Sequence, residues 1–445
     1  MTFLQESAMQ RHVTIIGGGV IGLTSAHSLV RAGHHVTLID AHAEVASETS
    51  HANGGQLSYR YVAPLADSGV PLQAIKWLLA GSEAPLRFRP QLDLAQWRWA
   101  LQFLAACHRR QHHQSASQLL SLAQHSQQIL AEWREQDGLS GFAWQQTGKL
   151  VVHRDQQALN KAIGARIAPD DQQPLDARQC IALEPALISQ QASLAGGIFS
   201  ASDETADCHA FCQALERQLI NSGRYTRFAS THVAPLSKEN GRIQYLDLIH
   251  IDGSRERWKV EEVVLAAGNH SAAMVRALGI RLPIQPLKGY SLTLPLSEGA
   301  IAPRISVTDA ARKVVYANLG SADSHQLRIA AMVDIGSHER DISHPAIDEG
   351  RIAALRRIAS TSFPEAGNFA DATPWAGLRP STPKGPPLIG HARHGRKKHD
   401  APDNLWLNTG HGSLGFTLAC GSADLITRAI SGDDLPSNLK VNFHN

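Results

Sequence analysis

The chain is poor in cysteine and has no surplus of either charge. Its 445 residues include five cysteines, an odd number, and none forms a CxxC pair or another spacing typical of metal ligands. We therefore expect no disulfide framework and no bound metal, and we infer a reducing compartment. The 42 basic and 40 acidic residues leave a formal net charge of +2. Such a balance gives no general attraction to nucleic acid, so no nucleic-acid partner is expected.

Long apolar runs are missing as well. Residues 1–11 lack the apolar core of a signal peptide, and no run approaches the roughly 20 residues that span a bilayer. We therefore expect a protein that is soluble or that attaches only to a membrane surface. The amphipathic pattern of Leu94–Cys107, with three aromatic residues, favours core packing, and a patch for a lipid surface or a partner subunit is the alternative.

What the chain does contain is a glycine-rich turn between a strand and a helix. The β-branched pattern His12–Ile16 predicts a buried strand, and Val20–Arg31 follows with helical periodicity. A second strand pattern, His35–Ile39, leads directly to an acidic residue. This context predicts a dinucleotide site, with the phosphates at the helix N-terminus and the acid on a ribose hydroxyl. FAD and NAD fit it equally well. The residues assigned to it are Gly17, Gly19, Val20, Ile21, Gly22 and Asp40.

A second unit of this kind lies near the end of the chain. The strand pattern Asn404–Asn408 is followed by the turn Thr409–Ser413 and a helix pattern over Leu414–Ile430. Because cofactor-type elements lie at both ends with unlike material between them, we expect domains that interleave in sequence. We predict a cofactor domain of residues 10–85, 196–282 and 370–445. A substrate domain would comprise residues 86–195 and 283–369.

Seven stretches carry a likeness to a known family. They are Ile15–Gly22, Glu48–Gln56, Val70–Trp77, Asp203–Thr205, Pro286–Ser291, Gly377–Pro383 and Asn408–Gly412. In these stretches the chain resembles the FAD-dependent D-amino acid dehydrogenases, within the wider group of D-amino acid oxidases and glycine oxidases. The stretches occur in the family's order and cover nearly the full chain. Lys288-Gly289-Tyr290 and Gly410-His411-Gly412 are the most specific of them.

The resemblance implies an α/β fold and selects FAD as the cofactor. A Rossmann-type FAD-binding domain would be interleaved with an α+β substrate domain built on a mostly antiparallel sheet. Backbone amides of the C-terminal glycine turn would face the flavin edge, where negative charge collects on reduction. The further cofactor residues implied are Thr49, Ser50, Asn53, Gly54, Gly55, Gln56, Val233, Gly268, Gly410, His411, Gly412, Leu414 and Gly415.

Arg379 is the residue expected to bind the substrate. Its guanidinium can hold a carboxylate through two hydrogen bonds and so fix Cα against flavin N5. Tyr290, Tyr316 and Arg312 are weaker candidates for shaping the pocket. Arg312 stands where the family has a tyrosine, so the substrate can differ from a small neutral D-amino acid. We assign no general base, because His411 is expected to act through its backbone.

The function implied is oxidative deamination of D-amino acids. The amine loses a proton, a hydride passes from Cα to flavin N5, and the imino acid hydrolyses to a 2-oxo acid and ammonia. A quinone or the respiratory chain would take the electrons, which implies a cytoplasmic enzyme that is peripheral on the inner face of the cell membrane. The alternative is an oxidoreductase for a secondary amine or cyclic amino acid, such as hydroxyproline, proline, sarcosine or glycine. A non-catalytic FAD-binding subunit is a further alternative, and Arg379 argues against it.

Overall fold

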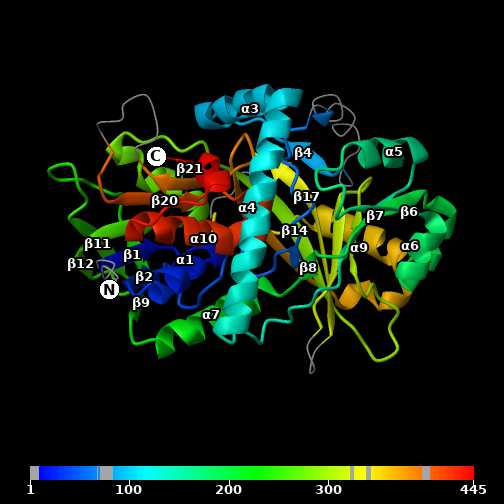
Figure 1. Cartoon of the computed structure of the whole chain (residues 1–445), viewed down its shortest axis with the longest axis horizontal. Coiled ribbons are helices and arrows are strands. Elements are labelled where there is room, and N and C mark those ends of the chain that lie inside the picture. The colour runs from blue at the N-terminus through cyan, green and yellow to red at the C-terminus, as the bar shows by residue number, and fades with distance from the viewer. Residues whose placement is uncertain are drawn as a thin grey trace, which may run out of the picture.

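The computed structural model describes residues 10–67, 69–70, 84–320, 325–336, 342–392 and 401–444. Its elements form two halves, each built around one large sheet (Figure 1). One half holds a largely parallel sheet flanked by helices, and the other holds a mostly antiparallel sheet. This arrangement confirms the predicted fold class. Most of the family-like stretch Val70–Trp77 lies outside the described residues.

The cofactor half is organised by a seven-stranded sheet that draws on both ends of the chain. Its strand order is β21-β19-β20-β13-β1-β2-β9. The strand β1 pairs in parallel with β2 and β13, and β13 pairs in parallel with β20. The strands are β1 (His12–Ile16), β2 (His35–Ile39), β9 (Tyr225–Phe228), β13 (Glu262–Leu265), β19 (Leu388–His391), β20 (Leu405–Thr409) and β21 (Phe443–His444). A small antiparallel sheet of β10 (Thr231–Val233), β11 (Tyr245–His250) and β12 (Arg255–Lys259) lies beside it.

Four helices build the core of this half. The first helix, α1 (Val20–Arg31), packs against α7 (Cys208–Asn221) and α10 (Gly415–Ser431). The long helix α4 (Arg109–Gln136) crosses α10, and its Leu122 and Trp133 join the same apolar core as α1 (Figure 1). Burial of such apolar faces is the main source of helix stability in proteins.

The second half is built on a nine-stranded sheet. Eight strands follow one another in the order β18-β14-β17-β16-β15-β5-β7-β6, and β4 pairs with β17. The helix α9 (Glu349–Ser362) packs on one face through Ile352, Leu355 and Ala359. The opposite face looks toward the cofactor half, because Ser291 donates a hydrogen bond to the carbonyl of Ala52. The strands are β4 (Leu86–Phe88), β5 (Lys149–His153), β6 (Gln173–Asp176), β7 (Gly196–Ser200), β14 (Gln285–Pro295), β15 (Ser306–Asp309), β16 (Val314–Asn318), β17 (Gln326–Ile335) and β18 (Thr373–Ser381).

The remaining helices and strands of the described residues lie outside the two large sheets and the four core helices. They are β3 (Gln56–Leu57), β8 (Glu204–Thr205), α3 (Leu94–Ala106), α5 (Gln156–Gly164), α6 (Ala177–Leu183) and α8 (Ser271–Met274). Short 3₁₀ turns lie at η2 (Pro185–Ser193), η3 (Gly268–His270), η4 (Arg276–Leu278), η5 (Pro364–Ala366), η6 (Phe369–Asp371), η7 (Gly412–Leu414) and η8 (Ser437–Asn442). In the part of the chain that the structure describes, no helix combines the length and the apolarity needed to cross a membrane.

Three elements do not follow the predicted domain boundaries. The strands β7 and β18 fall in segments assigned to the cofactor domain, yet both pair within the nine-stranded sheet. The helix α4 falls in a segment assigned to the substrate domain, yet it packs in the core of the cofactor half. Hydrogen bonding and apolar packing link these segments to distant parts of the chain, which the sequence does not display.

Candidate cofactor and substrate site

The turn after β1 has a shape that only glycine allows at two positions. Gly17 has a φ of +112°, and a Cβ there would lie 2.6 Å from the carbonyl oxygen of Ala266. A Cβ on Gly22 would overlap the carbonyl oxygen of Gly17. The first glycine therefore turns the chain beside β13, and the second lets α1 pack directly on the turn.

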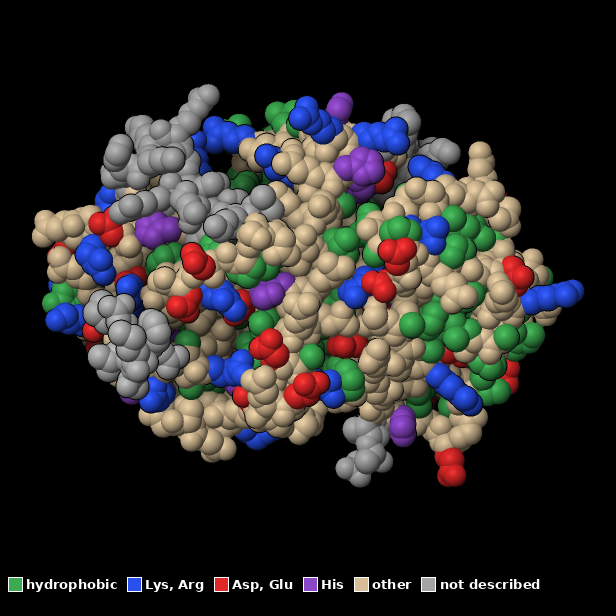
Figure 2. All heavy atoms as spheres, viewed as in Figure 1, with side chains coloured by type: hydrophobic (Ala, Val, Ile, Leu, Met, Phe, Trp, Pro, Cys, Tyr) green, Lys and Arg blue, Asp and Glu red, His purple; other side chains and the backbone are tan. Residues whose placement is uncertain are grey.

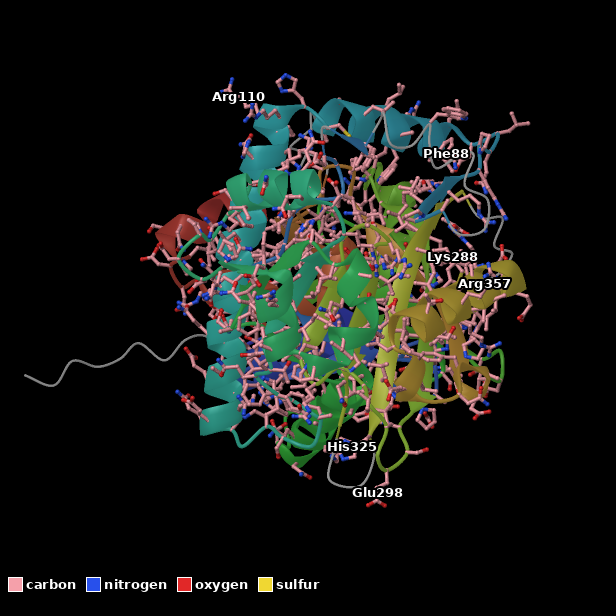
Figure 3. All side chains as sticks on the ribbon, turned by 90° about the vertical axis from the view of Figure 1, so that its right-hand side faces the viewer. Phe88, Arg110, Lys288, Glu298, His325 and Arg357 are labelled. Carbon is pink, nitrogen blue, oxygen red and sulfur yellow. The ribbon has the colours of Figure 1, made fainter. Side chains whose placement is uncertain are left out.

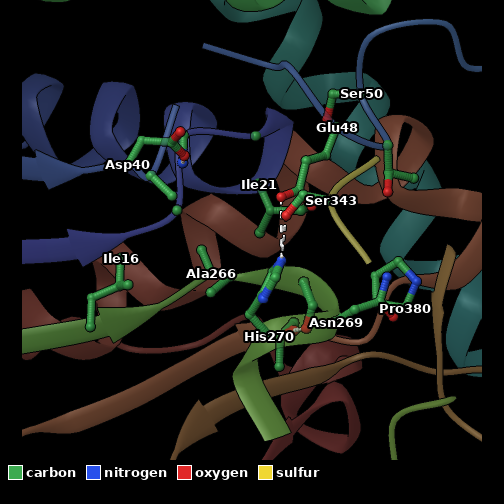
Figure 4. A pocket seen from close by; sticks show the side chains of 18 of the residues that line it. Ile16, Ile21, Asp40, Glu48, Ser50, Ala266, Asn269, His270, Ser343 and Pro380 are labelled. Atoms are coloured by element: carbon green, nitrogen blue, oxygen red, sulfur yellow. Dashed lines mark hydrogen bonds and ion pairs between the residues drawn. The ribbon is translucent and has the colours of Figure 1, made fainter. Parts of the chain in front are cut away.

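A cavity of about 360 Å³ opens at the carboxyl ends of β1, β2, β13 and β20 (Figure 4). This is the edge of a parallel sheet at which ligands of doubly wound folds bind. The structure places thirteen of the predicted cofactor residues in its wall: Gly17, Gly19, Val20, Ile21, Asp40, Thr49, Ser50, Val233, Gly268, Gly410, His411, Gly412 and Gly415. Their role as cofactor ligands remains a prediction.

Asp40 closes β2 at one end of this cavity. Its carboxylate accepts hydrogen bonds from the backbone N–H groups of Gly18 and His42, the latter at 2.8 Å. Burial nevertheless raises the pKa of this carboxyl above its usual value. A buried carboxylate gains from further donors, and a ribose hydroxyl would supply one.

The first turn of α1 lies along the same wall. The hydroxyl of Ser50 accepts a hydrogen bond from the Val20 N–H at 3.1 Å, so it satisfies one of the amides that a helix start leaves free. Gly19 caps the helix without a side chain, and no acidic residue occupies the first turn. The positive end of the helix dipole is therefore available for a pyrophosphate.

Six predicted cofactor residues do not line the cavity: Gly22, Asn53, Gly54, Gly55, Gln56 and Leu414. Gly22 serves helix packing, as described above. The loop Asn53–Gln56 lies along the nine-stranded sheet, because the carbonyl of Asn53 accepts a hydrogen bond from Arg328 and the Gln56 amide donates to Ser306 and Thr308. Leu414 lines a smaller neighbouring crevice. Contact of Asn53–Gln56 and Leu414 with the cofactor remains a prediction.

Three buried polar atoms in the cavity wall have no hydrogen-bond partner among the described residues. They are Asn269 Oδ1, Asn408 Oδ1 and His411 Nδ1. Leaving such an atom unpaired costs about 1–3 kcal/mol, so a ligand with polar groups at these positions would be favoured. The acid at β2, the helix start and these three atoms fit a dinucleotide cofactor that extends from Asp40 to His411.

His411 is held neutral in the C-terminal glycine turn. Its Nε2 lies 3.2 Å from the hydroxyl of Ser422, and burial lowers the pKa of the ring to about 3. Gly410 and Gly412 on either side have φ values of +82° and +58°. The imidazole therefore brings no positive charge to the cavity, and the turn can offer its backbone amides and the Nδ1 atom.

Glu48 is a cavity residue that the sequence reasoning did not assign. Its carboxylate lies 3.0 Å from His42 Nε2 and 3.3 Å from His270 Nε2, and His270 also contacts Ser343 (Figure 4). Burial acts to raise the pKa of Glu48, but the hydrogen bonds from the two histidines outweigh it and lower the pKa to about 2. His42 lies six residues before Glu48, but His270 and Ser343 come from distant segments, so no local pattern indicates the whole cluster.

Arg379 lies on the face of the nine-stranded sheet that looks toward the cofactor half. Arg379 is not among the residues that line the cavity, but its neighbours are fastened to the cavity wall. Pro380 lines that wall, and the carbonyl of Leu378 accepts hydrogen bonds from Thr49 and Asn269, each at 2.7 Å. The guanidinium donates to the carbonyl of Met332 at 3.1 Å, and no carboxylate pairs with it among the described residues. Burial lowers its pKa to about 10.

The backbone beneath Arg379 is shaped to receive its side chain. A Cβ on Gly289 would overlap the guanidinium, so glycine at this position leaves the room. Pairing of β14 with β17 shifts register between Lys288 and Tyr290, and Met332 opposite adopts a φ of +66°. A non-glycine residue rarely adopts such a φ. The bulge turns the Met332 carbonyl toward Arg379, and the Trp375 ring covers Gly377 alongside.

The other predicted substrate residues lie on the opposite face, under α9. Tyr290 donates a hydrogen bond to Asp334 at 3.0 Å, and the ring of Tyr316 packs edge-on against Phe363. Arg312 bonds the hydroxyl of Ser362. Tyr290 and Tyr316 lie on strands, whose side chains alternate between faces, and Arg312 lies in the turn between β15 and β16. All three lie away from Arg379, and their role in shaping the substrate pocket remains a prediction.

Comparisons with known proteins agree with this geometry. Residues 12–429 match the family described as FAD dependent oxidoreductase. The chain is 47% identical to D-amino acid dehydrogenase 2 of Pseudomonas aeruginosa over 95% of both chains, and 38% identical to D-amino acid dehydrogenase 2 of Ralstonia nicotianae over 94% of this chain and 96% of that one. Glycine oxidase from Bacillus cereus shares the fold, with a TM-score of 0.67 at 19% identity over 97% of this chain and 98% of the other.

Proposed function

Because this chain belongs to the family of FAD-dependent oxidoreductases, we propose that it oxidises D-amino acids to 2-oxo acids and ammonia. Two relatives that align over nearly their full length carry the name D-amino acid dehydrogenase. The same substrate class is supported by the site, which combines a dinucleotide cavity with a cation for a carboxylate. The cofactor is FAD, as the resemblance implies.

The observation that carries this proposal is the unpaired guanidinium of Arg379. A partly buried cation without a carboxylate is unfavourable, and the structure gives Arg379 only a backbone carbonyl. An α-amino acid would supply the missing carboxylate and two charge-assisted hydrogen bonds. The pair would fix the position of Cα relative to the cavity, which is the main service a protein gives in this chemistry.

Bound FAD would supply the two-electron acceptor that takes a hydride from the substrate's Cα. The chain contributes orientation and electrostatics. Arg379 would hold the carboxylate, Gly289 leaves the space for that pair, and Trp375 walls one side. The turn at Gly410–Gly412 leads into η7 and α10. Backbone N–H groups at the start of a helix favour negative charge, here at the edge of the cavity.

The electron acceptor is proposed from the relatives and not from residues of the site. We propose a respiratory quinone, which takes up two electrons and two protons to give the quinol, and a cytoplasmic enzyme that is peripheral on the inner membrane. This acceptor follows from the dehydrogenase names of the relatives rather than from a group in the cavity.

Anaerobic bleaching of the flavin tests the substrate class. The purified holoprotein is mixed without oxygen with matched D- and L-amino acids and with glycine, sarcosine, proline and hydroxyproline isomers. We expect D-amino acids to bleach the flavin absorbance and their L forms to leave it unchanged. Bleaching only by proline-like or N-methyl substrates would replace the proposal by the secondary-amine alternative. A purified chain without flavin absorbance would contradict the cofactor.

A further inference from the structure

The helix α3 presents a continuous apolar face to solvent. Leu94, Trp97, Leu101 and Leu104 recur every three or four residues, which places them on one side of the helix. Their exposed fractions are 73%, 45%, 66% and 53%. The exposed fraction of Leu92, just before the helix, is 109%. Single exposed leucines are ordinary, but a row of them marks an interaction surface.

The other side of α3 is fastened to the protein, so the exposed row is not a loosely placed element. The indole N–H of Trp99 donates to the carbonyl of Ser381 at 2.9 Å, and the Trp99 and Phe103 rings stack at 5.1 Å. Gln96 is fully buried and bonds the carbonyl of Arg89. The sequence offered two interpretations of this segment, core packing or an exposed patch. In the structure the side with Trp99 packs against the protein, and the side with Leu101 is exposed.

The unpaired charges near this face are basic. Between residues 84 and 131 the sequence holds five arginines and a single acidic residue, Asp93, and two of the arginines, Arg87 and Arg89, pair with Asp334 or Asp348. Asp93 caps the start of α3, where its side chain accepts the Ala95 N–H. Arg98, Arg109 and Arg110 are exposed and pair with no acid in the described part of the chain. Apolar, basic and histidine side chains share this upper edge of the molecule, and Arg110 lies at its margin (Figures 2 and 3).

A small crevice lies between the buried side of α3 and the wall of the cofactor cavity. Trp99 and Phe103 line one part of it, and Leu119 and Pro383 line another. His411 and Gly412 line both this crevice and the cofactor cavity. A helix with its side chains is about 10 Å across, so a surface docked on α3 would lie roughly one helix diameter from the turn at His411.

We propose that α3 docks this enzyme on an anionic lipid bilayer. The row Leu94, Trp97, Leu101 and Leu104 would enter the boundary between headgroups and acyl chains, and the flanking arginines would contact the lipid phosphates. Docking through α3 would bring a lipid-soluble acceptor to the side of the molecule where the crevice between α3 and His411 lies. This role in electron transfer rests on the quinone acceptor proposed above, whereas the docking itself does not.

Sedimentation of the holoenzyme with lipid vesicles tests the surface. Wild type is mixed at low salt with vesicles of phosphatidylcholine, with or without phosphatidylglycerol. We expect binding to the anionic vesicles, loss of that binding at high salt, and little binding to pure phosphatidylcholine. Leu101→Glu combined with Leu104→Glu should lower the partition coefficient at least about tenfold, because two carboxylates would enter the apolar layer. Arg109→Glu with Arg110→Glu should lower it through charge alone.

Two controls keep the outcome readable. Ile220→Glu with Ile251→Glu places the same charge on isoleucines that are 62% and 85% exposed on other elements, and we expect wild-type partition. Amino acid oxidation with a soluble dye is measured for every variant, so a failure of the proposed function shows there and not in the vesicles. Wild type that stays in solution with anionic vesicles would overturn the proposal. So would a stable dimer that the Leu101 and Leu104 changes dissociate, since a second copy would then cover the face.

Discussion

Two arginines on opposite sides of the nine-stranded sheet have opposite surroundings. Arg351, on α9, is fully buried and forms an ion pair with Asp334, which also accepts hydrogen bonds from Arg87 and Tyr290. Arg379, on the other face, has a backbone carbonyl and no carboxylate among the described residues. The first arginine is satisfied by the protein, and the second lacks an anion that a ligand can supply. The difference separates a structural cation from a binding one.

The same contrast extends to the three weaker candidates for the substrate pocket, which lie under α9. Tyr290 and Arg312 form hydrogen bonds with protein groups, whereas Tyr316 packs on Phe363 and its buried hydroxyl has no partner among the described residues. The face toward the cofactor half carries the unpaired guanidinium, a missing Cβ at Gly289 and a strained Met332. Strain of this kind persists where the surrounding structure imposes it, and it clusters at functional sites.

Arg379→Met should have the largest effect on catalysis. Loss of two charge-assisted hydrogen bonds, each worth roughly 1.5–3 kcal/mol, predicts a fall in kcat/KM of about 10²–10⁴-fold. The free energy of unfolding should stay about the same, because the partly buried guanidinium that is removed pairs with no carboxylate among the described residues. Dye-coupled kinetics and urea unfolding of the holoprotein measure the two quantities. Activity within a few-fold of wild type would remove Arg379 from the site.

Arg351→Met should give the reverse pattern. Asp334 would keep Arg87 but lose its buried partner, so unfolding should become easier by about 3 kcal/mol. The folded variant should retain KM and kcat within about threefold, since the side chain lies under α9. Tyr290→Phe serves as a milder probe of the same cluster. A large rise in KM with unchanged stability would mean that this face also binds substrate.

Gly289→Ala should weaken substrate binding without touching a charge. The new methyl group would overlap the guanidinium of Arg379, which is the movable end of a flexible side chain. We expect the guanidinium to shift, KM to rise about 10–50-fold and stability to change by less than about 1 kcal/mol. Gly164→Ala is the matched control, because a Cβ there meets nothing within 4 Å. Equal kinetics for the two variants would argue that the position of the guanidinium is immaterial.

The pH dependence of stability offers a smaller test, on the buried ammonium of Lys149. Its ammonium donates to Gln56 Oε1 at 2.9 Å and Ser58 Oγ at 2.6 Å, and burial lowers its pKa to about 8 against the opposing charge of Asp203. Between pH 8 and 10.5 the unfolded chain still carries this proton while the folded chain has lost it. Stability attributable to Lys149 should therefore rise with pH by about 1 kcal/mol or more. Urea unfolding at two pH values should show this as a growing difference in unfolding free energy between wild type and Lys149→Met, since both proteins share the opposite effect of buried cysteines whose pKa values burial raises.

Much of the cofactor half could be predicted from sequence because its signals are local. The strand, glycine turn and helix at Ile16–Leu23 follow one another in the chain, and Asp40 closes the next strand. The domain edges were less predictable, since α4 packs on α10 and β18 pairs with β14 across large sequence separations. The cluster of Glu48 with His270 is equally non-local.

The substrate side shows why strand patterns could not place side chains. Residues 287–292 of β14 are all buried, so no polar alternation marks which face is which. The bulge opposite Met332 further shifts the register. Arg379 was predictable only through its motif, and its lack of a carboxylate partner is visible only in three dimensions.

The most direct test of the account compares a substrate with and without its carboxylate. Anaerobic flavin reduction is followed with D-alanine and with D-alaninamide, for wild type, Arg379→Met and Arg351→Met. We expect wild type and Arg351→Met to react with D-alanine at least about 100-fold faster than with D-alaninamide, in second-order rate constant. In Arg379→Met the ratio of the two rate constants should be close to one. An Arg379→Met enzyme that still discriminates as strongly as wild type would contradict the assignment of this arginine to the substrate carboxylate.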